Sequence, residues 1–153
     1  MVQVHARLAG LPPHRTTEDV DLLPRHFNPR IIGRPVLAID GGAQALGRTM
    51  HVKLVDHDKI VTIAVPDLLG ALILKAAAAA SDNRETERHL RDAALLSALI
   101  TDHAEQRARL RGSDRQRLRS LAAKLSDEAH PAWLALPDNL ALRGKDTLRI
   151  LTA

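Results

Sequence analysis

The sequence predicts an α+β fold in which a β-rich half, residues 1–65, precedes a helical half, residues 66–153, within one compact domain. In the first half, prolines and glycines separate short runs of β-branched residues, a pattern typical of strands and turns. The second half opens on a long apolar run and then shows apolar residues at helical spacing. At 153 residues the chain is long enough to bury a hydrophobic core.

In the β-rich half we expect strands at residues 36–39, 51–55 and 59–65. The segment Asp56-His57-Asp58 separates the last two runs and is a plausible hairpin turn. The sequence therefore predicts one local hairpin and at least one further strand.

In the helical half, Pro66-Asp67 precedes a run to Ala80 whose only charged residue is Lys75, which predicts a helix that ends at Ser81. Further helices are expected at residues 85–101 and 102–111, and a fourth is expected after Ser113, which we interpret as its N-cap. Shorter helices are expected at the end of the chain, at residues 130–134 and 140–151.

Composition narrows the classes of function. Hydrophobic residues make up 45% and charged residues 26% of the chain, values of a globular rather than a disordered protein. One Trp, one Phe and no Tyr leave few rings on which a single nucleic-acid strand could stack. The absence of cysteine excludes disulfides and thiolate metal sites. The net charge of +4 permits attraction to nucleic acid or nucleotides without requiring it.

The N-terminal residues 1–7 contain no apolar core of a signal sequence, and no stretch is long and uncharged enough to span a membrane. We therefore expect a cytoplasmic protein without a membrane partner.

Asp19 and Asp21 form an Asp-x-Asp pair in a run that reads as a strand. In an extended chain the two carboxylates share one face, where they repel each other unless a cation or a proton intervenes. A divalent metal ion is the usual cation where the chemistry concerns phosphates. Arg15 and Thr17 are suitable donors to phosphate oxygens. The alternative is an exposed strand edge with two solvated acids.

Lys75 and Asp92 are charged residues on the apolar faces of two expected helices. Lys75 follows Leu72 by three residues, and Asp92 precedes Leu96 by four, so each shares a helix face with leucine. One interpretation is a buried ion pair, because buried charges are normally paired. The other is a cleft in which Lys75 meets a phosphate and Asp92 orients it or a metal. The two are compatible if the pair opens to admit a ligand.

Taken together, these segments resemble the nucleotidyltransferases of the AbiEii type, the toxin components of type IV abortive-infection toxin-antitoxin systems. The resemblance spans residues 3–100 and is carried by three segments: Arg15-Thr16-Thr17-Glu18-Asp19-Val20-Asp21, the apolar run with Lys75, and Glu87-Arg88-His89-Leu90-Arg91-Asp92. It implies a nucleotidyltransferase-like mixed sheet followed by a helical bundle.

The resemblance also implies site residues. Asp19 and Asp21 match the pair that binds Mg²⁺, Lys75 matches the lysine that contacts the triphosphate, and Asp92 matches its acidic partner. Together with Arg15 and Thr17, these residues would bind a nucleoside triphosphate. The implied acceptor is an RNA, such as tRNA, or a protein, and the implied partner is a cognate antitoxin.

The sequence departs from the family pattern before and after the Asp-x-Asp pair. The family places a Gly-Gly or Gly-Ser turn before that strand, whereas this chain begins at Met1, where the turn should end. The stretch from Asp21 to Gly41 is also short, and Asp40 and Asp56 are the nearest acids for a third carboxylate. The departures leave two interpretations open: the start is placed too late and a segment is missing from this sequence, or the chain is a degenerate copy, truncated at its N-terminus and internally.

Two functions remain open at this stage. The first is a Mg²⁺-dependent nucleotidyltransferase. The second is a catalytically inactive relative that acts as a binding or regulatory module through six arginines at positions 107, 109, 111, 115, 117 and 119. Such a run is otherwise a solvated surface, because residues two apart do not form one helical stripe. The eight histidines show no metal-ligand spacing.

Overall fold

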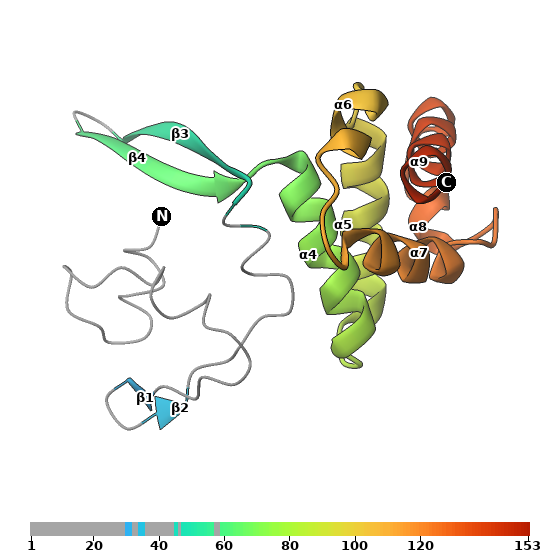
Figure 1. Ribbon diagram of the computed structural model, residues 1–153, viewed down its shortest axis with the longest axis horizontal. Coiled ribbons are helices and arrows are strands. Elements are labelled where there is room, and N and C mark those ends of the chain that lie inside the picture. Colours follow the sequence, from blue (N-terminus) through green and yellow to red (C-terminus); the bar gives the residue numbers. More distant parts are fainter. Residues whose placement is uncertain (1–29, 32–33, 36–44, 46, 57–58) are drawn as a thin grey trace. The chain divides into compact units, whose positions relative to one another are not determined.

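In a computed structural model, the structure describes residues 30–31, 34–35, 45, 47–56 and 59–153. The chain divides into two units, Met1–Asp67 and Leu68–Ala153. The described residues form antiparallel strands in the first unit and helices in the second (Figure 1). The α+β class expected from the sequence is confirmed.

The first unit contains the expected hairpin. Strand β3 (Thr49–Asp56) pairs antiparallel with β4 (Lys59–Pro66), in a register that places Asp56 opposite Lys59. His57 and Asp58, expected in the turn, lie outside the described residues, as does the run at 36–39. A second, shorter pair joins β1 (Arg30–Ile31) to β2 (Arg34–Pro35), which the sequence did not predict.

The register of the long hairpin separates its side chains by polarity. Cross-strand partners share a face, and one face carries three apolar pairs: Met50 with Val65, Val52 with Ile63, and Leu54 with Val61. The other face carries His51, Lys53 and Thr62, but also Ala64 and the exposed apolar pair of Val55 and Ile60. A slip of one residue would exchange the faces, so the three apolar pairs on the first face favour this register.

The second unit, residues 68–153, is described throughout. Its helices are α4 (Leu68–Ser81), α5 (Thr86–Leu99), α6 (His103–Ala108), α7 (Asp114–Lys124), α8 (Pro131–Leu134) and α9 (Asp138–Thr152). The expected helices at 66–80, 85–101 and 102–111 therefore exist, with ends that differ by a few residues. Figure 1 shows α4 and α5 side by side, with α9 against α5.

The core of this unit is aliphatic except for one aromatic residue, Trp133. Buried alanines on α4 and α5, among them Ala76 and Ala93, allow these two helices to approach closely. Trp133 of α8 is buried, and its indole Nε1 donates a hydrogen bond to the main-chain oxygen of Leu125 at 3.0 Å. The sole tryptophan is thus a core residue.

Helix α9 confirms the helix expected at residues 140–151 and extends it at both ends, to 15 residues. Small and apolar residues at 141, 144, 148 and 151 follow helical spacing along it. A Cβ built on Gly144 would lie 2.9 Å from both Ser97 Oγ and Trp133 Cζ3. Glycine is needed at this position because any side chain would collide with Ser97 and Trp133, against which α9 packs.

The helix caps differ from the sequence interpretation at one position. Ser113 precedes α7 as expected, but its side chain makes no capping hydrogen bond. The next residue, Asp114, is fully buried, and its Oδ2 accepts a hydrogen bond from the main-chain nitrogen of Arg111 at 2.8 Å. Asp102 caps α6 by accepting a bond from the nitrogen of Glu105. At both helix starts an aspartate side chain therefore accepts a hydrogen bond from a nearby main-chain nitrogen.

Candidate functional site

Lys75 and Asp92 form an ion pair between α4 and α5. Lys75 Nζ lies 2.7 Å from Asp92 Oδ2, which is the length of a charge-assisted hydrogen bond. The two side chains are 33% and 41% exposed. The pairing that one interpretation predicted is present, but its burial was wrong: both groups lie at the edge of the helix contact, within reach of solvent.

The topology of the helices explains why these residues meet. A tight turn joins α4 to α5, so the two helices run antiparallel. Lys75 lies seven residues before Asp82, and Asp92 lies seven residues after Glu85, at equal distances from the two ends of the turn. The midpoints of the helices therefore face each other. Their apolar neighbours pack inward, and the charged groups occupy the boundary with solvent.

The other predicted site residues cannot be placed beside this pair. Arg15, Thr17, Asp19 and Asp21 lie outside the described residues, and so does Asp40. Their proposed roles remain predictions. Across the ranges that the structure does describe, no group of three or more His, Asp or Glu side chains is arranged to hold a metal ion.

His89, which belongs to the segment that carries the resemblance, contacts the turn between α4 and α5. Its Nε2 lies 3.2 Å from Asp82 Oδ2, while the buried Nδ1 has no hydrogen-bond partner among the described residues. Asp82 Oδ1 accepts a further bond from the main-chain nitrogen of Arg84 at 2.8 Å. These contacts hold the turn that sets Lys75 opposite Asp92.

The Asp82 carboxylate gives the turn a defined response to acid. The hydrogen bond from the Arg84 main chain, followed by that from His89, lowers the pKa of Asp82 below its ordinary value of 3.8. Because the pKa of Asp82 is lower in the folded chain than in the unfolded chain, its carboxylate stabilises the fold at pH values above the unfolded-state pKa. This stabilisation is lost as the pH falls through the folded-state pKa.

We therefore expect Asp82→Asn to lower the melting temperature at pH 7, because the amide replaces a charged acceptor. The difference from the parent chain should shrink as pH falls below 3.8. Thermal unfolding followed by circular dichroism from pH 7 to pH 2.5 measures it. Asn83→Ala, in the same turn, changes no ionisable group and serves as the control. A difference that stays constant with pH would contradict the assigned role of the carboxylate.

The six arginines of α6, α7 and their connection divide into two groups. Arg109 and Arg117 are partly buried: Arg109 donates to Gln106 Oε1 at 2.7 Å, and Arg117 Nη1 lies 3.9 Å from Asp114 Oδ1. The remaining four are exposed, and we call them the arginine face: Arg107, Arg111, Arg115 and Arg119. The solvated surface expected from the sequence therefore applies to four of the six residues.

A contact that the sequence did not predict joins α6 to α9. Thr147 is fully buried, and its Oγ1 donates to the main-chain oxygen of Arg143 at 2.9 Å. Because that hydroxyl hydrogen is used, the 2.9 Å contact with His103 Nε2 requires the imidazole to donate. His103 is thereby held as a structural residue. The two partners are 44 residues apart, so no local pattern indicates the contact.

Comparison of the chain with protein-family models, curated proteins and solved structures gives no match. In the described part of the chain, no helix is both long and apolar enough to cross a membrane.

Proposed function

We propose that this chain is a nucleotidyltransferase-like protein of the toxin type, which transfers a nucleotide from a nucleoside triphosphate to an RNA or protein acceptor in a Mg²⁺-dependent reaction. The observation that carries the proposal is the ion pair of Lys75 and Asp92 at 2.7 Å. The resemblance assigns both residues to one site, and both are partly exposed. Cytoplasmic location and a cognate antitoxin belong to the same proposal.

Each proposed residue has a chemical role. The ammonium of Lys75 neutralises charge on the triphosphate, above all on the departing pyrophosphate, and Asp92 orients that ammonium. Arg15 and Thr17 donate hydrogen bonds to phosphate oxygens. Asp19 and Asp21 would hold Mg²⁺, which supplies polarisation of the phosphate when bound.

The transfer itself is a displacement at the α-phosphorus. The hydroxyl oxygen of the acceptor bonds to the α-phosphorus, and the bond from that phosphorus to the bridging oxygen breaks. Pyrophosphate leaves with the electron pair of that bond, while the hydroxyl proton passes to solvent. Positioning the triphosphate and neutralising its charge are therefore the main tasks of the chain's own residues.

The proposal is tested with the purified chain, Mg²⁺, labelled nucleoside triphosphates and total tRNA or protein acceptors. We expect label to appear in the acceptor fraction and the Asp19→Ala variant to lose at least a hundredfold of the rate, as for the loss of a charged catalytic group. Absence of nucleotide binding by calorimetry, with a melting temperature unchanged by Mg²⁺ and triphosphates, would refute the proposal.

A second candidate function is a catalytically inactive relative that acts as a binding or regulatory module. The arginine face favours it, because four exposed guanidinium groups form no ion pair with an Asp or Glu side chain among the described residues. This candidate predicts association with an anionic partner without any transfer of label in the same assay.

A further inference from the structure

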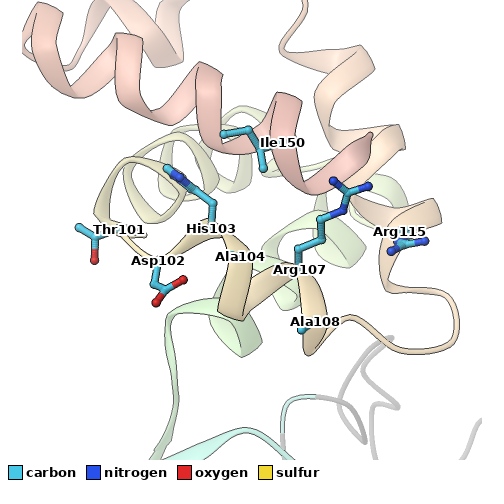
Figure 2. A pocket seen from close by; sticks show the side chains of 8 residues that line it. All are labelled: Thr101, Asp102, His103, Ala104, Arg107, Ala108, Arg115 and Ile150. Carbon is cyan, nitrogen blue, oxygen red and sulfur yellow. The ribbon is translucent and has the colours of Figure 1, made fainter.

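An open hollow of about 830 Å³ lies where α6, the start of α7 and the last turns of α9 meet. Its wall includes Arg107 from α6, Arg115 from α7 and Ile150 from α9 (Figure 2). Figure 2 shows the two guanidinium groups at the same end of the hollow, while the carboxylate of Asp102 lies at the other end, beside Thr101. Lys75 is not among the lining residues.

Two members of the arginine face are held in place at the end of α9. Arg107 Nη2 donates to the main-chain oxygen of Ala153 at 2.9 Å, and Arg119 Nε donates to that of Thr152 at 3.3 Å. Arg115 lies one helical turn before Arg119, on the same side of α7. The carbonyl end of α9 therefore gathers positive charge around the hollow.

These arginines retain most of their hydrogen-bonding capacity. A guanidinium has five N–H donors, and the contacts to α9 use one donor each from Arg107 and Arg119. Within residues 68–153, no Asp or Glu side chain forms an ion pair with any residue of the arginine face. The one acid lining the hollow, Asp102, already accepts a bond from the nitrogen of Glu105. The like charges repel each other until an anion is bound.

We propose that this hollow binds a ligand with a chain of two or more phosphate groups, at a site distinct from Lys75. Phosphate oxygens match the planar fork of a guanidinium, and adjacent phosphates allow Arg107 and Arg115 each to engage one group. The volume lies in the range of small-ligand sites. A free nucleoside triphosphate and the backbone of RNA both present this chemistry. The site does not depend on the proposed transfer reaction.

The first test is calorimetric titration of the full chain with tripolyphosphate. We expect Arg115→Gln to weaken binding about tenfold or more, since a charge-assisted contact is lost, and the additional change Arg107→Gln to weaken it further. Arg84→Gln is the matched control, because Arg84 is exposed in the turn that precedes α5, whereas the hollow lies beyond the other end of that helix. The Arg115 side chain makes no hydrogen bond or ion pair with another described residue, so its replacement should leave the melting temperature unchanged.

Repeating the titration with Lys75→Met separates this site from the proposed catalytic one. Binding of tripolyphosphate that survives Lys75→Met and is weakened about tenfold or more in Arg115→Gln supports the hollow, whether or not the chain transfers nucleotides. Binding that is unchanged in Arg115→Gln, or reduced equally in Arg84→Gln, would overturn the inference.

Competition against bound tripolyphosphate identifies the source of the phosphates. A single-stranded RNA that competes better than ATP, with an affinity that falls steeply with salt, indicates the RNA backbone. ATP that competes better, with a stoichiometry of one, indicates a free nucleotide. Failure of both to compete would overturn the assignment of the hollow as a phosphate site.

Discussion

Replacing Trp133 with alanine is expected to lower the free energy of unfolding of the helical unit by about 3–5 kcal/mol. Trp133 is 2% exposed and heads the largest fully buried side chains of the described residues. Its removal leaves a cavity beside Gly144, against which the indole ring packs closely. The main-chain oxygen of Leu125 also loses its indole donor. The change combines lost apolar burial with an unsatisfied acceptor.

Two further variants identify the cause of the loss. Trp133→Phe retains much of the apolar volume but cannot donate to Leu125, so we expect a smaller loss of about 1–3 kcal/mol. Leu134→Ala, at a neighbouring residue that is 71% exposed, should change stability by less than about 0.5 kcal/mol. Urea unfolding followed by far-ultraviolet circular dichroism measures all three, because the variants at position 133 lack the tryptophan signal. Equal losses at positions 133 and 134 would contradict the packing described here.

The hairpin and the first helices could be predicted because their signals are local. β-branched and apolar residues in 49–56 and 59–66, which alternate with polar ones over residues 49–54, predict the two strands. The apolar run before Ser81 specifies α4 in the same way. The helix at 140–151 was predicted in the same way, but the need for glycine at position 144 was not, because Trp133 and Ser97, which Gly144 approaches, come from other parts of the chain.

The candidate site was predictable in part. The meeting of Lys75 and Asp92 follows from two helices of similar length joined by a short turn, which can be recognised in the sequence. Their partial exposure could not be predicted, because it depends on which neighbours reach the edge of the α4–α5 contact.

The exposure of the six arginines between residues 107 and 119 could also not be predicted from the sequence. Spacing of two indicates no single stripe, and partly buried arginines alternate with exposed ones both at the end of α6 and along α7. The burial of Asp114 beside Arg117 depends on the packing of the whole helical unit. The burial of Asp114 could therefore not be predicted from a local sequence pattern.

If Lys75 serves the proposed transfer reaction, Lys75→Met should lower the rate of nucleotide transfer by about 10²–10³, since one preorganised charged donor to the phosphates is lost. Its effect on stability should be small, because a partly exposed ion pair contributes only about 0.2–1 kcal/mol. Asp92→Asn should also slow the transfer, since the ammonium is then less well oriented. Labelled-nucleotide kinetics and thermal unfolding, measured on the same preparations, separate the two effects.

The decisive variant exchanges the two charges, Lys75→Asp together with Asp92→Lys. It retains an ion pair between α4 and α5, so the melting temperature should return close to that of the parent chain. The ammonium would project from the other helix, however, and transfer should remain as slow as in Lys75→Met. Asp146→Asn, which removes the exposed pair with Arg149 on α9, is the matched control and should retain full activity. Recovery of transfer in the exchanged variant would show that the pair acts only through stability and would remove Lys75 from the proposed site.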